Sequence, residues 1–431
     1  MQHSKRSLLS NTLPLSIGVN FALALFSCIV PCPAKAQITP DATLGDKSSV
    51  VVNTLNSSEI NGGAIQGSNL FHSFKEFNVG EAARAYFSNP SGISNILTRV
   101  TGNNASNILG TLGVSGQANL FLINPKGIVF GPNATLDLRG SFVASSADSL
   151  VFDNGLEFSA TNPLSPPLLT VNIPVGLRLR ENSANIVNQS SAVLDLPSGN
   201  TLGLVGGNVI LDGGSLRVAG GRIELGGLTG AGIVGFNVQE SQGIARVASL
   251  SFPNGIERAD VSLSNEAVVN VAAGGGGSIA INGRNVNIVG GSKLLAGIDQ
   301  NSGSPGTQAG NIEINATDQV VFSGVSSNNA ISGVFNQVET GAQGNSGDIN
   351  IKAASLEVRE GAQLSASTSG NGNAGKILIN AEKQVLFDGG SDTGNFSYAF
   401  SQVEKGAEGN SGGIEIKAGN LTVSNGAQLS A

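Results

Sequence analysis

Cysteine, tryptophan, histidine and charged residues are all scarce in this sequence. Its 431 residues include two Cys, two His and no Trp, and only 12% are Asp, Glu, Lys or Arg. Both cysteines, Cys28 and Cys32, lie near the N-terminus, before Gln37. The remainder therefore forms no disulfide and offers no thiolate nucleophile. It also holds a single histidine, which is too few for a zinc site of the usual His and Cys ligands.

That histidine, His72, would have to serve any Ser-His-Asp triad. It lies in the segment NLFHSF, beside Phe71 and Phe74. Because its neighbours are apolar, we expect His72 to be packed within or at the edge of a core rather than to act in catalysis.

Clustered carboxylates are missing as well. Polysaccharide lyases and hydrolases on repetitive β folds need several carboxylates on one face, often with Ca²⁺. The pair Asp388 and Asp392 indicates a solvated loop, and neither a Walker loop nor a Gly-Gly-x-Gly-x-Asp calcium repeat occurs. We therefore predict no catalytic residue, no metal site and no cofactor. The other acids occur singly, among them Asp137, Asp212, Glu224, Glu313 and Asp348.

Glycine is abundant, with 60 residues, and it accompanies many Asn, Ser, Val, Ile and Leu. This composition disfavours helices and favours short strands joined by tight turns. A hydrophobic fraction of 40% is enough to build a core. The net charge is −7, or −10 without the three cations Lys5, Arg6 and Lys35. An acidic chain is a poor partner for nucleic acid or for an anionic membrane.

The N-terminal segment 1–36 has the pattern of a Sec signal peptide. Lys5 and Arg6 precede an uncharged stretch over 7–34, and Ala34-Lys35-Ala36 gives a small-x-small cleavage site before Gln37. The Sec translocon is therefore an expected partner. Two alternatives remain: an uncleaved membrane anchor, which Asn11, Pro14 and Asn20 disfavour, and a lipoprotein signal ending at Cys28, which Phe26 fits poorly.

The C-terminal part repeats itself with a constant offset, the 65-residue period, which is the mark of a solenoid. Three pairs of segments carry the repeat: Gln337–Glu339 with Gln402–Glu404, Asn345–Gly347 with Asn410–Gly412, and Gly361–Ala366 with Gly426–Ala431. At about 20 to 25 residues per coil, one period predicts about three coils. The chain ends at the same point of the repeat as Ala366, so we expect a truncated chain or a fragment of a longer protein.

Within the period, apolar and polar residues alternate. Ile349 and Ile351 fall on one face and Lys352 on the other, and Leu356 and Val358 repeat the pattern. Such half-buried strands, bounded by Gly and Asn, stack in parallel as a β-helix. With coils about 4.8 Å apart, the chain would form a rod of about 80 Å. The proline-rich region 148–198 interrupts the pattern and predicts an excursion outside the helix.

Two Asn-Pro turns stand between apolar runs. Asn124-Pro125-Lys126-Gly127 fits a type I turn, and Asn89-Pro90-Ser91-Gly92 shows the same pattern earlier in the chain. Ile follows each turn, as Ile128 and Ile93. On physical grounds alone these are corners between coils. The alternation after the second turn, with Ala134, Leu136 and Leu138 on one face, predicts a further half-buried strand.

Four long segments resemble the N-terminal part of filamentous-haemagglutinin-type exoproteins of two-partner secretion. They are 38–45 (ITPDATLG), 62–79, 86–102 and 118–147. The resemblance covers about residues 37–300 and implies a right-handed parallel β-helix with an N-terminal cap and small extra-helical β elements. The family's signature turns match Asn89, Pro90, Gly92, Ile93, Asn124, Pro125, Lys126, Gly127 and Ile128. Ser91-Gly92 and Lys126 depart from the residues most common there.

The resemblance also implies a route and a function. A signal peptide (1–36) would precede a two-partner-secretion domain (37–300) and β-helical repeats (301–431). The periplasmic domains of an outer-membrane β-barrel transporter would recognise the unfolded domain, and the chain would fold outside. We therefore expect a non-enzymatic, secreted or surface exoprotein with a structural or adhesive rod, whose Asn, Ser and Thr suit carbohydrate or self-association. Two alternatives stay open: a surface polysaccharide-active enzyme, and a truncated toxin-delivery protein.

Overall fold

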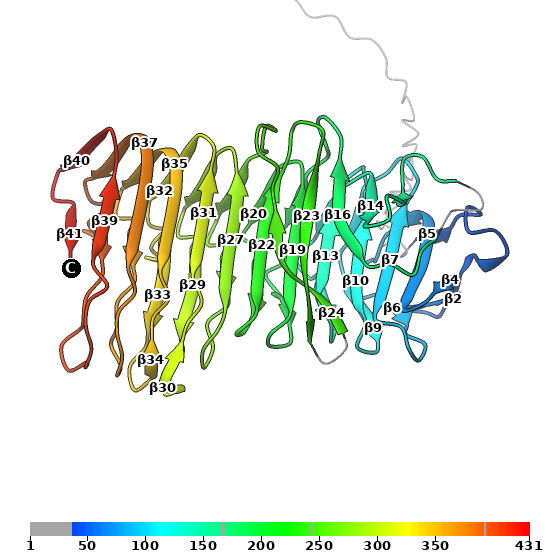
Figure 1. The fold of residues 1–431 in the computed structure, drawn as a ribbon, viewed down its shortest axis with the longest axis horizontal. Helices are drawn as coiled ribbons and strands as arrows, with labels where there is room; N and C mark the ends of the chain where they lie inside the picture. The colour runs from blue at the N-terminus through cyan, green and yellow to red at the C-terminus, as the bar shows by residue number, and fades with distance from the viewer. Residues whose placement is uncertain (1–36, 165–168, 242–243, 392–393) are drawn as a thin grey trace, which may run out of the picture. The chain divides into compact units, whose positions relative to one another are not determined.

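Residues 37–164, 169–241, 244–391 and 394–431 are described by the structure, a computed structural model. They form a parallel β-helix in which strands of successive coils stack into long ladders (Figure 1). The first ladder runs through the whole length: β5 (Asn69–Phe77), β7 (Asn95–Val100), β10 (Asn119–Ile123), β13 (Phe142–Ser145), β19 (Thr201–Gly206), β22 (Arg222–Gly227), β27 (Ser278–Gly283), β31 (Ile312–Ala316), β35 (Ile349–Arg359), β37 (Ile377–Asp388) and β39 (Ile414–Lys417).

Two further ladders complete each coil. The second contains β8 (Ser106–Ile108), β11 (Ile128–Phe130), β17 (Ile186–Asn188), β20 (Val209–Asp212), β25 (Val261–Ser264), β28 (Val286–Val289), β32 (Gln319–Ser323), the second halves of β35 and β37, and β40 (Asn420–Ser424). The third consists of two sheets. They are β3 (Ser57–Gly62), β6 (Arg84–Ser88), β9 (Thr111–Ser115) and β12 (Thr135–Asp137), then β18 (Leu194–Leu196), β21 (Ser215–Val218), β26 (Val268–Asn270), β29 (Lys293–Ile298), β33 (Gly333–Val338), β36 (Gln363–Ser365), β38 (Tyr398–Phe400) and β41 (Gln428–Ser430).

Antiparallel pairs occur in the N-terminal cap, where they involve the first strands of two ladders, and in a sheet outside the ladders. The N-terminal cap pairs β1 (Ile38–Pro40) and β4 (Ala64–Gln66) with β5, and β2 (Ser49–Asn53) with β3; η1 (Gly45–Lys47) is a short 3-10 turn. The extra-helical sheet contains β14 (Ser149–Phe152), β15 (Glu157–Ser159), β16 (Pro174–Leu179), β23 (Gly232–Ser241) and β24 (Ile244–Ser251). A short parallel pair, β30 (Gly303–Gln308) and β34 (Gln343–Asn345), extends one corner.

The 65-residue period corresponds to two coils, so the expectation of three is wrong. Ile312 pairs with Ile349 on the next coil, and Ile349 pairs in turn with Ile377, the residue one period after Ile312. Corner loops absorb the extra length without adding a strand to the first ladder. One such loop, closed by the bridge between Val325 and Ile331, returns one period later as the loop bridged by Gly390 and Phe396. Eleven strands about 4.8 Å apart give about 50 Å of stacked coils rather than 80 Å.

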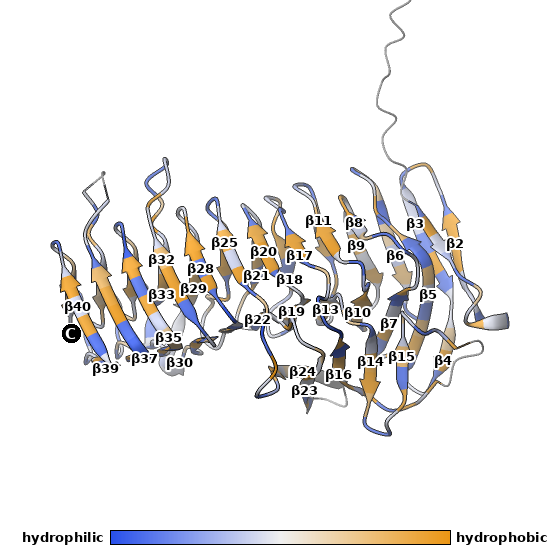
Figure 2. Ribbon diagram, turned by 90° about the horizontal axis from the view of Figure 1, so that it is seen from above, coloured by the Kyte–Doolittle hydropathy of each residue, from blue (hydrophilic) through white to orange (hydrophobic). Residues whose placement is uncertain are grey.

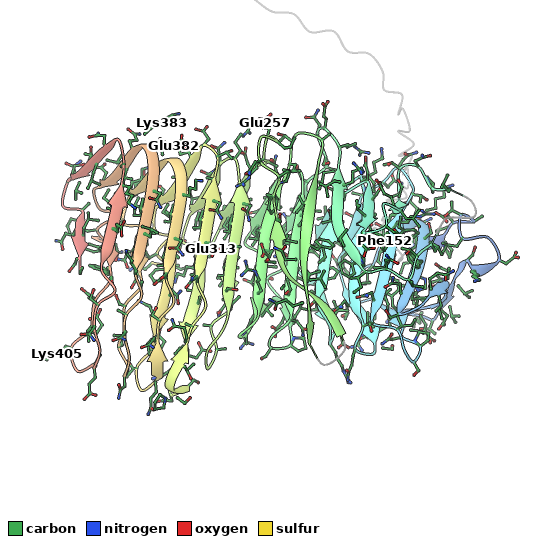
Figure 3. All side chains as sticks on the ribbon, in the orientation of Figure 1. Phe152, Glu257, Glu313, Glu382, Lys383 and Lys405 are labelled. Atoms are coloured by element: carbon green, nitrogen blue, oxygen red, sulfur yellow. The ribbon has the colours of Figure 1, made fainter. Side chains whose placement is uncertain are left out.

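The interior is an unbroken column of inward-facing Ile, Leu, Val and Phe side chains from all three ladders. Hydrophobic residues make up much of the ladder strands, as the colouring of Figure 2 shows. Each strand contributes every second residue to the interior, and the residues between them face outward. In β31, for example, Ile312 and Ile314 are fully buried whereas Glu313 lies on the outer face (Figure 3). The same holds after the second Asn-Pro turn, where Ala134 and Leu138 are buried and Leu136 packs against the core. Neighbouring coils therefore bury one another, as expected for a solenoid.

A second apolar layer explains why the N-terminal strands of the first ladder are buried on both faces. The extra-helical sheet packs over β7, β10, β13 and β19, and its side chains form a separate core with their outward residues. Phe71 of β5 contacts Phe152 and Phe158 of this sheet at centroid distances of 6.1 and 5.0 Å. In β10, for example, all five residues are buried, and the four from Leu120 to Ile123 are apolar without alternation.

The expected excursion has different bounds. It ends at Leu179, because β17 and β18 return to the second and third ladders. Its sheet also recruits the hairpin β23–β24, whose alternating residues resemble those of an ordinary coil. Periodicity alone does not distinguish that hairpin from a coil, because both have one apolar face.

Candidate functional site

The turn at Asn124 is a buried corner between β10 and β11. The N–H of Gly127 donates to the carbonyl of Asn124 at 2.9 Å, which closes a β-turn at the expected position. The Asn124 side chain is fully buried: its Nδ2 donates to the carbonyl of Asn104 at 3.0 Å and to the Ser106 Oγ at 2.9 Å. Its Oδ1 accepts the Lys126 N–H at 2.9 Å. Asn124 therefore ties this corner to the preceding coil.

The rest of this turn is enclosed as well. Pro125 and Ile128 are buried, and the carbonyl of Pro125 accepts a hydrogen bond from Arg180 Nη2 at 2.9 Å. Gly127 has φ +100°, and a Cβ there would lie 2.8 Å from the carbonyl oxygen of Asn185. From Asn124 to Ile128, only Lys126 is exposed.

The turn at Asn89 lies at a different corner, between β6 and β7. Its hydrogen bond runs from the Ile93 N–H to the carbonyl of Pro90 at 3.2 Å, so the turn is displaced by one position relative to the other. Pro90, Ser91 and Gly92 are exposed, whereas Ile93 is buried. A Cβ added at Gly92, where φ is +83°, would meet open space.

The two motifs that look alike in sequence are therefore not equivalent in space. One joins the third ladder to the first and is exposed, and the other joins the first to the second and is buried. The structure does not bring their residues together into one site. As folded corners, Asn124 and Pro125 are inaccessible to a partner.

A buried arginine near the N-terminal cap was not anticipated from the sequence. Arg99 of β7 is 1% exposed and donates to the Ser73 Oγ at 2.9 Å, the Thr43 Oγ1 at 2.7 Å and the carbonyl of Ser159 at 2.7 Å. Its guanidinium also lies 4.2 Å from the centre of the Phe158 ring. Arg99 therefore links the cap, the first ladder and the extra-helical sheet.

Asp41 provides the matching negative charge. Burial lowers the pKa of Arg99 to about 10, and the Asp41 carboxylate opposes this effect. Burial by itself raises the pKa of Asp41, but hydrogen bonds from Thr101, Thr43 and Ser73 outweigh it and leave the pKa below its usual value. Both groups therefore stay charged at neutral pH, and the segment ITPDATLG is held to the coils by this network.

A cavity of about 460 Å³ opens beside Arg99 between the first ladder and the extra-helical sheet. Asp148, Glu157 and Arg178 line it, and Arg178 pairs with Glu157 at 2.6 Å. The guanidinium of Arg99 already has three hydrogen-bond partners, so the cavity presents no unsatisfied charge from this residue to a ligand.

Three asparagines form a ladder at the start of successive strands. Asn119 Nδ2 donates to Asn95 Oδ1 at 2.9 Å, and Asn95 Nδ2 donates to Asn69 Oδ1 at 3.1 Å. Asn69 continues to the carbonyl of Asn172 at 2.7 Å, and the Ser141 N–H donates to Asn119. The recurring triplets SNL, SNI and ANL could have revealed this ladder, because Asn takes the same position in each strand.

His72 is fully buried, as expected. Its Nδ1 lies 2.9 Å from the Ser49 Oγ, and its ring packs against Phe74 and Phe87 at centroid distances of 6.0 and 5.2 Å. Burial lowers the pKa of His72 to about 3. No serine and acid are assembled around it as in a triad, since Ser49 is its one hydrogen-bond partner in the described chain.

The remaining predicted residues lie outside the described ranges or at their first residue. Ala34 and Ala36 of the cleavage site lie outside the described residues, as does Asp392. Gln37 is exposed, and its carbonyl accepts the Asn78 N–H at 3.1 Å. Within the described ranges no group of three His, Cys, Asp or Glu is arranged for a metal ion. The same ranges contain no helix with the length and apolarity of a membrane span.

A family model and a solved structure agree with this architecture. The model of the TPS secretion domain matches residues 36–281. The crystal structure of the HMW1 secretion domain from Haemophilus influenzae is similar in fold, with a TM-score of 0.53 at 17% identity. That match covers 88% of this chain and 100% of the other. The filamentous hemagglutinin secretion domain matches at 13% identity and a TM-score of 0.35, over 91% of this chain and 99% of that one.

No match was found among curated proteins. The family match nevertheless covers more than half of the chain, including the cap, both Asn-Pro turns and the extra-helical sheet. The chain therefore belongs to the TPS secretion-domain family, that is, to exoproteins of the filamentous-haemagglutinin type that cross the outer membrane with the help of a partner transporter.

Proposed function

We propose that residues 37–300 form the domain that the periplasmic part of the transporter recognises, and that residues 301–431 form a structural or adhesive rod on the cell surface. A Sec signal peptide, residues 1–36, would deliver the chain to the periplasm. The product is a non-enzymatic secreted or surface protein. The observation that carries this proposal is the family match over residues 36–281, which starts at the expected cleavage site.

Burial of the second Asn-Pro turn bears on when recognition occurs. Asn124, Pro125, Gly127 and Ile128 are enclosed in the folded domain, so a transporter can contact them only before the coils close. The mature chain has no cysteine, and no disulfide resists threading through a barrel. We therefore infer that the transporter recognises this motif in the unfolded chain. In the folded chain the same motif is a corner between two coils.

The test is binding to the purified periplasmic domains of the cognate transporter. Segment 37–300 is presented either folded or held unfolded in urea and diluted immediately before mixing. We expect the unfolded segment to bind and the folded one to bind weakly. Asn124→Ala with Pro125→Ala should weaken binding of the unfolded segment, because it alters the turn-forming residues of the motif.

A matched control lies a short way further along the chain. Pro132 and Asn133 form an exposed turn on the other side of β11, and Pro132→Ala with Asn133→Ala makes the same chemical change outside the motif. If both double variants bind as well as the parent, the motif is a corner only. If the folded domain binds as well as the unfolded one, recognition uses another surface.

The rod assignment depends on the repeats. Each coil buries its neighbours, so further coils lengthen the rod without changing its cross-section. The C-terminal coils lack the extra-helical sheet and expose their outward side chains directly to solvent. These outward faces are where an adhesive or self-associating surface would lie.

A further inference from the structure

The outer face of the third ladder carries a repeated set of side chains. β33 and the residue after it read GVFNQVE, and β38 with the residues after it reads YAFSQVE, one period later. Phe335, Gln337 and Glu339 face outward and recur as Phe400, Gln402 and Glu404. The two rows are two coils apart, because β36 lies between β33 and β38.

The repeat preserves the outside of this strand better than its inside. The inward residues change from Val334 to Ala399 and from Asn336 to Ser401, although the core requires close packing, and only Val338 is kept. The first outward position changes from Gly333 to Tyr398, but the outward Phe, Gln and Glu that follow are identical in both copies. Folding alone places stronger demands on inward positions, so identity at three successive outward ones points to a role for the surface.

An open cavity of about 290 Å³ lies beside the first copy. The half-buried ring of Phe335 and the side chain of Leu295 give it an apolar wall. Gln337 and Glu339 lie on the same side, and Lys293 and Asp299 belong to the polar lining. The site thus combines an aromatic face with amide, carboxylate and ammonium groups.

The amide of Gln337 is held in place. Its Nε2 donates to the Ser365 Oγ at 2.7 Å, and the hydroxyl of Ser365 donates onward to Ser367 at 3.2 Å. In the second copy, Gln402 Nε2 donates to Glu404 Oε1 at 2.7 Å. Lys405 follows at the tip of the corner loop (Figure 3). Such fixed polar groups lose little entropy when they bind a ligand.

We propose that this face binds a neutral glycan, with one sugar ring in the cavity at Phe335 and a second contact at Phe400. Aromatic rings pack against the apolar C–H face of a pyranose, and amide and carboxylate groups bond its hydroxyls. An anionic sugar is disfavoured, because Asp299 and Glu339 outnumber Lys293. The two copies, one period apart, give a linear polymer two weak contacts whose effects multiply. The inference refines the adhesive part of the proposed function, on which it rests, and does not depend on transporter recognition.

The experiment uses the whole mature chain, residues 37–431, and saturation-transfer-difference NMR. The probes are maltotriose, cellotriose, chitotriose and β-1,4-galactotriose, with sialyllactose as the anionic comparison. We expect binding of at least one neutral trisaccharide, with a Kd at least tenfold weaker in Phe335→Ala. In Phe335→Ala with Phe400→Ala the signal should be lost. Gln337→Ala, which leaves the aromatic packing intact, should also weaken binding.

Leu421→Ala is the control, because this side chain of β40 is 45% exposed, lies on the second ladder outside the repeated set and can be removed without opening the core. It should leave binding unchanged. Absence of binding to every neutral probe, tighter binding of sialyllactose, or equal binding by parent and Phe335/Phe400 variants would overturn the proposal. Secretion of the same variants through the transporter is measured in parallel. Normal secretion with lost glycan binding separates this site from the export function.

Discussion

Individual residues in this chain make structural contacts that the neighbouring sequence only partly predicts. The pattern Asn-Pro-Lys-Gly predicts a turn correctly, because Asn, Pro and Gly each favour their turn positions. It does not reveal that the Asn124 side chain reaches back to Asn104 and Ser106 on the previous coil. Those contacts depend on which coils are neighbours, and a local pattern does not contain that information.

The first prediction concerns this side chain. Asn124→Ala removes two donors and one acceptor and leaves the fully buried Ser106 hydroxyl without its partner. Each orphaned buried polar group costs about 1–3 kcal/mol, so we expect a loss of about 2–4 kcal/mol. Native-state hydrogen exchange of the backbone amides of residues 104–128 measures this loss of stability. Asn133→Ala, at an exposed turn, should leave exchange unchanged; equal protection in both variants would contradict the assigned contacts.

The second prediction follows from His72. Its pKa is about 3 in the folded chain because of burial, against an ordinary value of 6.5. Between these values the unfolded chain binds the extra proton, so stability falls as the pH falls. From pH 7.5 to pH 5 the loss should be about 2 kcal/mol, since one pKa unit corresponds to about 1.4 kcal/mol.

Urea unfolding midpoints of residues 37–431 at the two pH values provide the measurement. His72 is the one histidine after residue 36, and few other groups titrate in this range. His72→Phe places a ring of similar shape among Phe74 and Phe87 and should remove most of the pH dependence. An unchanged drop in that variant would assign the effect to other groups.

At the scale of elements, glycines fix how closely coils can stack. Gly310, Gly347, Gly375 and Gly412 form a column just before strands of the first ladder. A Cβ at Gly347 would lie 2.0 Å from the Gly310 carbonyl oxygen, and one at Gly375 would lie 2.0 Å from that of Gly347. The sequence shows Gly347 and Gly412 as a repeat of Asn-Ser-Gly, but only the stacked coils explain why no side chain fits.

The third prediction is that a side chain at Gly347 would clash with the backbone of the preceding coil. Gly347→Ala should lower stability by about 3 kcal/mol or more, since the contact is with backbone that cannot move without shifting a coil. Gly274→Ala is the control: a Cβ there would lie 3.5 Å from its nearest atom, an ordinary contact. Thermal unfolding followed by circular dichroism compares the two. Similar midpoints would mean that the column tolerates a side chain.

At the scale of the whole molecule, the sequence predicts the architecture better than its dimensions. Alternation in segments such as 349–358 predicts stacked parallel strands, and the order of long motifs identifies the family. The predicted number of coils per period is wrong because corner loops such as 324–332 lengthen the chain but add no strand to the ladders. The hairpin β23–β24 and the role of Arg99 escape prediction because both depend on contacts between segments distant in sequence.

The fourth prediction links the repeats to export. If folding outside the cell draws the chain outward, weakening a coil should slow secretion, because less free energy is released when that coil folds. Ile379 is fully buried in the column, and its neighbour Leu378 on the same strand faces outward. Ile379→Asn buries an amide and removes packing, at a cost of about 2–5 kcal/mol. Leu378→Asn makes the same change on the solvent side.

We expect pulse-chase secretion through the cognate transporter to be several-fold slower for Ile379→Asn and close to the parent rate for Leu378→Asn. The solenoid explains the difference, because each coil supplies the surface on which the next one folds. A coil that closes slowly delays every coil behind it, whereas a change on the outer face does not. Equal secretion rates, with Ile379→Asn shown to be less stable when purified, would separate export from folding and leave the transporter to move the chain by other means.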